Sequence, residues 1–547
     1  MTSFVWLYRN LDRRLPRPTL SSERLTLIVA LAFTFFYNGA FWHGATADLD
    51  LSAPNGWLTL IGYAVVLTGL QYVVFLLGVA RWNVKPLLSV LILIAAAVSY
   101  FTSTYGTYFD TTMIDNVAQT DVAEASELMT PGFVLHLVLY GVLPVLLVWR
   151  VRVPRQTWKR RLGGRLAYLA STAVVLVAAI LLGYSHLSPL MRNHKELRYL
   201  VTPGNYLVSS GRVLADSHET GPQQRLPLGE DATRDVHSGK PRLLVIVVGE
   251  TLRAANWGLD GYQRQTTPHL AKRDLVNYSD VRSCGTSTAV SVPCLFSPWG
   301  RDDYDADAIA SHQSLLDILQ HTGIDVTWID NQSGCKGVCD GVDSVSIGAD
   351  AYPRWCDGGR CLDEALVEAL RRRLDGQPHD RVIVLHQLGN HGPSYFERYP
   401  PAYRHFTPEC RDPDLSQCEA RTIVNAYDNA ALYTDHVLDA LIGTLQAQSS
   451  YDSSLIYLSD HGESLGEHGL YLHGLPYAIA PDEQTHVPMI WWLSAGFRQA
   501  LGIDEQCLEA DAGAPHSQAN LFHTVLGISD VKTRVYRPEL DLSRACR

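Results

Sequence analysis

The stretch RLLVIVVGET, residues 242–251, decides the fold class of this chain. Its run of aliphatic, mostly β-branched residues is typical of a β-strand, and it ends in the polar pair Glu250 and Thr251. Further runs of this kind alternate with helical patterns along the rest of the chain. The alternation predicts a soluble α/β domain built around a mostly parallel sheet over residues 241–547.

Polar residues collect at the ends of four such runs, and in open α/β sheets sites form beyond the carboxyl ends of strands. Taken alone, each of these residues is more often a helix cap or a packed side chain. Together, Glu250, Asp460 and His461 offer the oxygen and imidazole ligands that suit zinc or manganese. The other polar residues at these ends include Ser333, Lys336, His386, His391 and Glu463.

A hydroxyl-rich loop, CGTSTAVSVPC at residues 284–294, is the only dense supply of alcohols near a strand end. Its serines and threonines could simply satisfy backbone groups in a fixed turn. Alternatively, one of them is a nucleophile that a nearby metal ion activates. The pattern of residues alone leaves both interpretations open.

The ten cysteines all lie at or after Cys284, most of them in close pairs. An even count confined to one region is typical of disulfides formed in an oxidising compartment. A structural zinc site is the alternative, because Cys335 and Cys339 have a plausible ligand spacing. Disulfides are favoured, since no CxxC pair faces another.

The first 186 residues are largely apolar and predict a transmembrane domain of five helices. Lys and Arg alternate between the connecting loops so that the N-terminus is expected in the cytoplasm and the chain beyond the last span outside. The first span is expected to be an uncleaved anchor and not a signal peptide. The net charge of -11 gives no reason to expect a nucleic-acid partner. The predicted spans are 25–42, 56–80, 86–101, 132–149 and 166–184.

Two polar segments complete the chain. In the loop 113–129, Asn116, Thr120 and Glu124 are spaced four apart and therefore share one face of a predicted helix. That face is either simply solvated or binds a lipid head group at the membrane surface. Residues 187–240 are expected to form a connector with short interfacial helices and a linker.

Five stretches carry a resemblance to a known family: VVGETLRAANWGLDGYQRQTTP, CGTSTAVSVPCLFS, DNQSGCKGVCD, HQLGNHGPSY and YLSDHGESLGEHGLYLHG. In this order they resemble the phosphoethanolamine transferases that modify lipid A, the group that includes the mobile colistin-resistance enzymes. Five preceding spans fit this family as well. The resemblance implies the fold of alkaline phosphatase and the sulfatases.

The resemblance also implies roles for single residues. Thr288 matches the nucleophile, bound to zinc together with Glu250, Asp460 and His461. The matches to substrate-binding positions are His391 and His473 (phosphate or a second zinc), Ser333 and Lys336 (phosphate), Glu463 (near the metal), and Asn116, Thr120 and Glu124 (donor head group). The matches to family disulfides are Cys284–Cys294, Cys356–Cys361 and Cys410–Cys418, and Cys335–Cys339 is a further pair around Lys336. The residues left without a role are His468, His386, His486, His516, His523, Cys507 and Cys546.

The activity implied is transfer of phosphoethanolamine from phosphatidylethanolamine to a lipid A phosphate through a covalent adduct on Thr288. His473 is the candidate that moves a proton. One tightly bound zinc ion is expected, and a second is left open. The protein is expected in the bacterial inner membrane, with its catalytic domain in the periplasm. It is expected to be a monomer that contacts membrane lipids.

Other functions compete with this one. Related transferases modify Kdo, heptose or glucan acceptors. A membrane-anchored sulfatase or phosphodiesterase would use water as acceptor, but the sulfatase motif C-x-P-x-R is absent because LFSP follows Cys294. A non-catalytic envelope protein that binds lipid or metal is opposed by the intact set of Glu, Thr, Asp and His.

Overall fold

The computed structural model describes residues 17–47, 49–120, 122–193, 195–219, 225–235, 239–357 and 360–547. The chain forms two compact units, and the division between them is not linear along the sequence. The first unit contains the chain up to Ile114 together with Met129–Ala215, and the second contains Asp115–Leu128 with Asp216–Arg547. The polar loop within the predicted transmembrane region is therefore part of the second unit.

The first unit contains four helices that are long and apolar enough to cross a membrane, or five spans if a bent pair is counted. These spans are α2 (Ser22–Phe36) with α3 (Gly39–Thr46), α4 (Pro54–Gly78), α5 (Val84–Tyr105), Pro131–Arg150, and the first part of α10 (Trp158–Asn193). Large exposed apolar side chains within the described residues lie almost entirely between Ile28 and Leu214. A surface of this kind suits lipid and not water.

The first, third and fourth predicted spans differ in shape or length from the helices observed. The first is bent by 58° between α2 and α3, where the side chain of Asn38 donates to the carbonyl of Phe33 and competes with the helical backbone. The third, short by sequence, is a helix of 22 residues. The fourth contains a π-helical stretch, Leu137–Val142, that ends two residues before Pro144, which has no N–H to continue the normal pattern.

Polar side chains tie the helices of the first unit to the predicted connector. Gln71 and Asn38 both donate to the carbonyl of Thr202, at 2.9 Å each, and Gln71 also accepts from Thr34 at 3.1 Å. Each of these groups would be costly in hydrocarbon without a partner. The connector itself contains a 3₁₀-helix (Lys195–Leu200) and α11 (Gly204–Glu219), and α10 continues to Asn193, beyond the predicted end of the last span.

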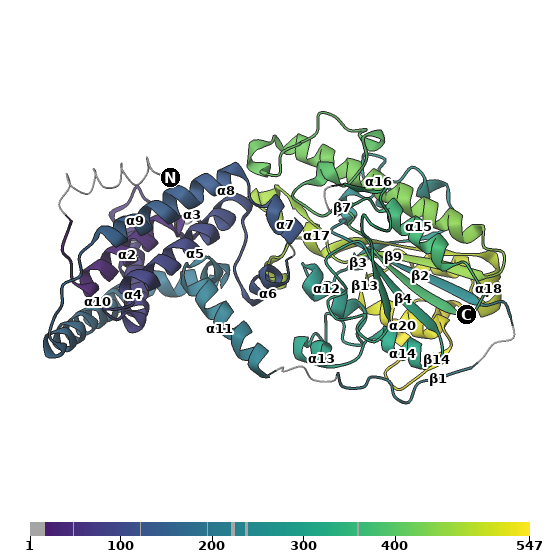
Figure 1. The fold of residues 1–547 in the computed structure, drawn as a ribbon, viewed down its shortest axis with the longest axis horizontal. Coiled ribbons are helices and arrows are strands. Elements are labelled where there is room, and N and C mark those ends of the chain that lie inside the picture. Colours follow the sequence, from purple (N-terminus) through teal and green to yellow (C-terminus); the bar gives the residue numbers. More distant parts are fainter. Residues whose placement is uncertain are drawn as a thin grey trace. The chain divides into compact units, whose positions relative to one another are not determined.

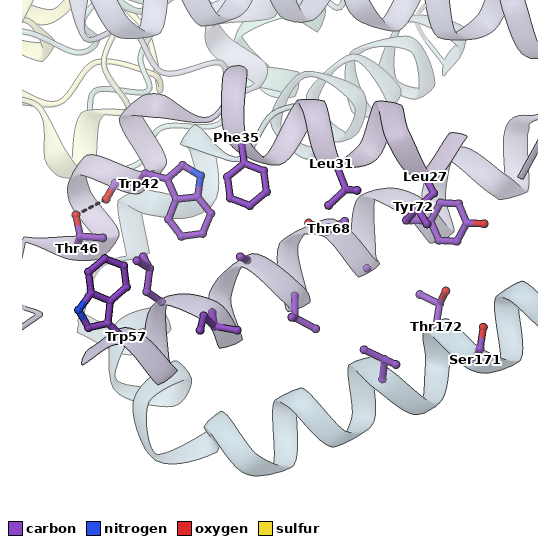
Figure 2. A pocket seen from close by; sticks show the side chains of 16 residues that line it. Leu27, Leu31, Phe35, Trp42, Thr46, Trp57, Thr68, Tyr72, Ser171 and Thr172 are labelled. Atoms are coloured by element: carbon purple, nitrogen blue, oxygen red, sulfur yellow. Dashed lines mark hydrogen bonds between the residues drawn. The ribbon is translucent and has the colours of Figure 1, made fainter. Parts of the chain in front are cut away.

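A cavity of about 750 Å³ lies between α2, α3, α4 and α10. Figure 2 shows Trp42 and Trp57 at one end of it and Tyr72, Ser171 and Thr172 at the other. Nearly all of its lining is apolar, which suits hydrocarbon and not a polar ligand.

The second unit is built on an eight-stranded sheet in which seven described strands run in one direction and only β12 runs against them. The order across the sheet is β13 (His516–Ser517), β3 (Val276–Arg282), β12 (His486–Leu493), β9 (Asp452–Ser459), β2 (Arg242–Gly249), β8 (Arg381–His386), β4 (Asp325–Asp330) and β5 (Asp343–Ser346). Every residue of β2 is buried, because helices cover both faces of the sheet.

Those helices form two layers, with α15 and α16 on one face of the sheet and α12, α14 and α20 on the other (Figure 1). Leu244, Ile246 and Val248 of β2 pack into one buried apolar cluster with α14 and α20. The fold class predicted from the sequence is therefore confirmed. The helices of this unit include α12 (Thr288–Leu295), α13 (Ala306–Ser311), α14 (Leu315–His321), α15 (Glu364–Arg373), α16 (Ala420–Gln446), α17 (Asp482–Thr485), α18 (Ala495–Leu501), α19 (Glu505–Asp511) and α20 (Ala519–Ile528).

Five disulfides join the ten cysteines, and all lie in the second unit. They are Cys284–Cys294, Cys335–Cys339, Cys356–Cys361, Cys410–Cys418 and Cys507–Cys546. Cys335 and Cys339 are thus bonded to each other and are not a zinc-binding pair. Three two-stranded sheets complete the unit: β1 (Thr233–Arg234) with β14 (Val531–Lys532), β6 (Cys356–Asp357) with β7 (Arg360–Cys361), and β10 (Ser464–Leu465) with β11 (Tyr471–Leu472).

Candidate active site

Two neighbouring parallel strands bring three potential metal ligands together. β2 and β9 pair in register up to Gly249 and Ser459, so the next residues, Glu250, Asp460 and His461, emerge side by side. One ligand atom from each lies within 4.8 Å of the others, and all three residues are fully buried. The sheet register thus places the three residues that the sequence singled out as ligands.

The donor atoms of this group fit a divalent cation. Asp460 Oδ2 is buried and has no hydrogen-bond partner among the described residues, although His461 Nε2 lies 3.4 Å away. His461 Nδ1 donates to the carbonyl of Gly462 at 2.9 Å, which leaves Nε2 with its lone pair toward the group. An unpartnered buried carboxylate oxygen is expensive unless a cation or water meets it, and two carboxylates with one imidazole suit zinc.

The charges of the three groups are strongly linked. Burial opposes ionisation of Glu250, but the hydrogen bond and charge of His461 outweigh it and hold the pKa of Glu250 well below its ordinary value. Burial and the charge of Glu250 raise the pKa of Asp460 to about 6. Burial alone would lower the pKa of His461, but Asp460 and Glu250 raise it to about 10. The group therefore attracts positive charge, and a bound cation would displace a proton from it.

Thr288 is the alcohol of the hydroxyl-rich loop that meets this group. It is the first residue of α12, which follows the carboxyl end of β3 at the same edge of the sheet. Its Oγ1 lies 3.1 Å from Glu250 Oε2 and 3.3 Å from His461 Nε2. By contrast, Thr286 donates to the carbonyl of Leu475, so its hydroxyl has a structural partner.

His473 lies beside the group and begins a short hydrogen-bonded chain. His473 Nδ1 lies 2.8 Å from Glu463 Oε2, and the other oxygen of Glu463 accepts from the Tyr395 hydroxyl at 2.6 Å. The centres of the His473 and His461 rings are 4.3 Å apart. Because Nδ1 donates to Glu463, the proton of a neutral His473 lies on Nδ1, and Nε2 carries the lone pair.

His391 meets the polar loop of the predicted membrane domain. Its Nε2 lies 3.4 Å from Glu124 Oε1. Burial lowers the pKa of His391, but the charge of Glu124 outweighs this and raises it to about 9. The loop after β8 also contacts Glu250 closely: Gly389 has φ +53°, and a Cβ there would lie 2.7 Å from the Glu250 carbonyl oxygen.

The predicted single helix face of Asn116, Thr120 and Glu124 is wrong. α6 (Thr111–Gln119) ends before Thr120, and Glu124 lies on a second short helix, α7 (Val122–Glu127). Threonine favours helices weakly, and the Thr120 hydroxyl donates to the carbonyl of Asn116 at 2.8 Å at the end of α6. Among the described residues, Glu124 is the one of the three that contacts His391.

Ser333 and Lys336 follow β4 and contact each other, since Lys336 Nζ donates to Ser333 Oγ at 2.8 Å. In the described part of the chain, their hydrogen bonds do not reach Glu250 or its neighbours. His386 pairs with Asp330 at 2.9 Å, and Asp330 accepts from the backbone of Gly334 in the same loop. The histidines without a predicted role include structural ones of this kind.

Three residues at the site were given no role by sequence reasoning. Gln518 donates to the carbonyls of Ser459 and Asp460 and accepts from the backbone N–H of Cys284, so it links β9 to the hydroxyl-rich loop. Thr251 donates to Glu250 at 2.5 Å through its hydroxyl, and Tyr395 orients Glu463. Strand-end position pointed to Thr251, but no local pattern marks Tyr395 or Gln518.

Comparison with known proteins identifies the family. The family model "Phosphoethanolamine transferase EptA/EptB" matches residues 67–218, and the sulfatase model matches residues 242–531. The phosphoethanolamine transferase EptA of Escherichia coli K12 is 40% identical over 98% of this chain and 99% of its own length. The chain belongs to the phosphoethanolamine transferase family.

Two further relatives have a similar identity to this chain. The phosphatidylethanolamine transferase Mcr-1 of Escherichia coli is 39% identical over 87% of this chain and 90% of its own length. The solved structure of the integral membrane lipooligosaccharide phosphoethanolamine transferase A of Neisseria meningitidis is 40% identical, with a TM-score of 0.93 over 97% of this chain and 100% of that chain. The transferase fold therefore extends over both units, and the family resemblance of the sequence motifs is confirmed.

Proposed function

We propose that this chain transfers phosphoethanolamine from phosphatidylethanolamine to a phosphate of lipid A, with Thr288 as the covalent carrier. The observation that carries the proposal is the position of Thr288 Oγ1, within 3.3 Å of both Glu250 and His461. An alcohol in that position, in a family of phosphoethanolamine transferases, needs only to lose its proton to attack phosphorus.

Glu250, Asp460 and His461 would hold a zinc ion, and Thr288 would complete its ligands. Zinc bound there lowers the pKa of an alcohol and offsets negative charge on phosphoryl oxygens. The residues fit one such ion, because their ligand atoms converge within 4.8 Å. A second ion is proposed only as an alternative role for His391 and His473.

The chain's own residues then perform two displacements. In the first, Thr288 Oγ1, whose hydroxyl proton has already passed to solvent, forms a bond to the donor phosphorus. The bond from phosphorus to the diacylglycerol oxygen breaks, and His473 supplies a proton to that oxygen. In the second, a lipid A phosphate hydroxyl gives its proton to His473 and its oxygen attacks the same phosphorus, while Thr288 leaves as the alkoxide that began the cycle. Glu463 supports both steps, because its hydrogen bond keeps a proton of His473 on Nδ1 and leaves Nε2 to donate or accept the proton of each step.

The substrate groups are proposed to lie between the strand ends and the loop Asp115–Leu128. His391, Ser333 and Lys336 would contact the phosphate. The donor amine would meet acidic and polar side chains of the loop, namely Asn116, Thr120 and Glu124. Charge supports this arrangement, because the ethanolamine ammonium is a cation and Glu124 is an acid. Burial opposes ionisation of Glu124, but the charge of His391 outweighs burial and lowers the pKa of Glu124.

We propose that the second unit lies in the periplasm and that one chain is sufficient for the reaction. Five disulfides favour an oxidising compartment, and the basic loops favour a cytoplasmic N-terminus. Both proposed substrates are lipids, so a membrane-anchored enzyme meets them at the outer face of the inner membrane. A lipid A phosphate is preferred to a Kdo acceptor because the chain is 40% identical to EptA of Escherichia coli K12 but 27% identical to the Kdo(2)-lipid A phosphoethanolamine 7''-transferase of the same strain.

A hydrolase is the second candidate, since the sulfatase family model covers residues 242–531. Water would then replace the lipid A phosphate in the second displacement. The two candidates differ in product: the transferase gives lipid A carrying phosphoethanolamine, and the hydrolase gives free phosphoethanolamine with diacylglycerol.

The test compares lipid A from cells that express the wild type, Thr288→Ala or a control. We expect lipid A to gain the mass of phosphoethanolamine with the wild type and to be unmodified with Thr288→Ala. The control, Thr322→Ala, removes the same atoms from a threonine whose hydroxyl donates only within its own helix end, and it should act as wild type. Intact-protein mass spectrometry should find the adduct on Thr288. An adduct on another hydroxyl would overturn the choice of nucleophile, and unmodified lipid A with inserted wild-type protein would overturn the acceptor.

A further inference from the structure

The segment Asp115–Leu128 is attached to the second unit by buried charges. Glu127, at the end of α7, places one carboxylate oxygen on each of two guanidinium groups: Oε2 lies 2.7 Å from Arg398 Nη2, and Oε1 lies 2.8 Å from Arg360 Nε. The side chain of Arg398 is fully buried, and that of Glu127 is 10% exposed. This cluster of Glu127, Arg360 and Arg398 lies outside the group of residues that performs the proposed chemistry.

Arg398 connects this cluster to His391. Its Nε donates to the backbone carbonyl of His391 at 2.6 Å, while its Nη2 meets Glu127. One planar guanidinium therefore holds both the backbone of a proposed substrate-binding residue and the carboxylate of the segment. Three residues before Glu127, on the same face of α7, Glu124 contacts the imidazole of the same His391.

We propose that Glu127 and Arg398, assisted by Arg360, form a clamp that holds Asp115–Leu128 over His391, and that both are positioning residues for the transfer reaction. The role in transfer rests on the proposed function, but the docking of the segment does not. The 3.4 Å contact between Glu124 and His391 is longer than either contact of Glu127 with the two arginines.

Charge and burial explain why this attachment is strong. A guanidinium without access to water requires a carboxylate partner, and Arg398 has Glu127. Arg360 lies in the β6–β7 hairpin, which the Cys356–Cys361 disulfide closes, so the second partner is also held in place. Removing the negative charge of Glu127 leaves two arginines facing one another and favours an undocked segment.

The clamp also has a consequence for the substrate. Asp115–Leu128 includes Asn116, Thr120 and Glu124, the residues proposed to receive the donor head group. A segment that is docked for a smaller fraction of the time offers a complete site less often, so apparent affinity for the donor falls first. Turnover from the docked state depends on Thr288 and His473, which the clamp does not touch.

The experiment measures hydrogen exchange and kinetics on the full-length protein in detergent micelles. Glu127→Gln keeps the shape of the side chain and removes its charge. We expect backbone amides of residues 115–128 to exchange about tenfold faster or more, while the strands of the sheet exchange as in wild type. KM for phosphatidylethanolamine should rise about tenfold, with a smaller change in kcat.

Three further variants sharpen the result. Arg398→Gln should repeat the effect of Glu127→Gln, and Arg398→Lys should be intermediate because it retains the charge but not the fork. Arg372→Gln is the matched control, because it breaks an exposed ion pair with Glu368 on α15 and should change neither measurement. If Arg398→Gln does not fold, Glu127→Gln still tests the clamp, since it alters only the segment Asp115–Leu128.

Unchanged exchange at 115–128 in folded Glu127→Gln protein would overturn the clamp. Faster exchange with unchanged KM would overturn its positioning role. If the wild type transfers no phosphoethanolamine but Glu127→Gln still loosens the segment, the docking stands and the proposed function fails.

Discussion

At the scale of single residues, the carboxylate of Glu463 determines the tautomer of His473. Glu463 is fully buried and shares its two oxygens between His473 and Tyr395. The imidazole is thereby fixed in one tautomer, with its proton on Nδ1 and the lone pair on Nε2. His473 gains its proposed chemical role from this contact and not from its own position in the sequence.

Glu463→Gln is expected to lower kcat about 100-fold, since an amide can turn its NH2 group toward Nδ1 and favour the wrong tautomer of His473, and it carries no negative charge. Tyr395→Phe removes only the hydrogen bond to the other oxygen and should lower kcat less than about tenfold. The measurement is the steady-state release of diacylglycerol at saturating phosphatidylethanolamine. Equal effects of the two substitutions would contradict this division of roles.

The sequence predicts residues at this scale only where a local pattern marks them. Glu250, Asp460 and His461 follow strand-like runs, so their convergence could be inferred from a parallel sheet. Tyr395 and Gln518 could not be inferred, because Tyr395 meets Glu463 across 68 residues of sequence and Gln518 meets Cys284 across 234. Such contacts depend on the packing of loops, which has no periodic signal.

At the scale of elements, the loop Cys284–Cys294 and helix α12 present Thr288 to the strand ends. The disulfide closes a loop with a sequence separation of 10, and α12 begins inside it at Thr288. The backbone N–H of Cys284 donates to Gln518 at 2.7 Å, which fixes the start of the loop. Holding an alcohol in place before the reaction lowers the entropy that must be lost in the transition state.

Replacing Cys284 and Cys294 together by alanine is expected to reduce activity far more than stability alone explains. Loop closure predicts a loss of about 2–3 kcal/mol in the free energy of unfolding for a loop of this length. The matched control replaces Cys410 and Cys418, whose sequence separation is 8 and whose loop holds no predicted site residue. Thermal unfolding and transfer rates are measured for both variants. A similar fall in stability with activity lost only in the first variant is the expected result, and equal loss of activity in both would refute it.

Elements were predicted well where a pattern runs without interruption and poorly where side chains compete with the backbone. The buried strands and the second span agree with the structure, since each is a continuous run of apolar residues. The bend at Asn38 and the break near Thr120 were not predicted. In both places a polar side chain bonds to a helix carbonyl, and apolar spacing alone does not report that competition.

At the scale of the whole molecule, the catalytic unit is made from two separate parts of the chain. Asp115–Leu128 lies between two membrane spans in the sequence but belongs to the second unit. A reading along the chain assigned this segment to the membrane domain, because composition shows where a loop is and not what it contacts. The membrane half therefore contributes more than an anchor, since it supplies Glu124 and Glu127 to the other unit.

This arrangement predicts how a fragment of residues 225–547 behaves. The fragment keeps Glu250, Asp460 and His461 and its own buried apolar cluster, so it should fold and bind one zinc ion with an affinity within about tenfold of the full chain. Its kcat/KM for phosphatidylethanolamine in micelles should nevertheless fall about 100-fold or more, because the segment that completes the site is missing. Zinc titration and diacylglycerol release measure the two effects separately.

A control distinguishes the missing segment from the missing membrane anchor. Full-length Glu127→Gln protein keeps the anchor and is expected to lose only part of the donor affinity, so its kcat/KM should lie between those of the wild type and the fragment. If the fragment matches the full chain on micellar donor, the segment contributes nothing to catalysis and the site is complete within one continuous domain. If Glu127→Gln equals the fragment, docking of the segment, and not attachment to the membrane, accounts for the whole difference.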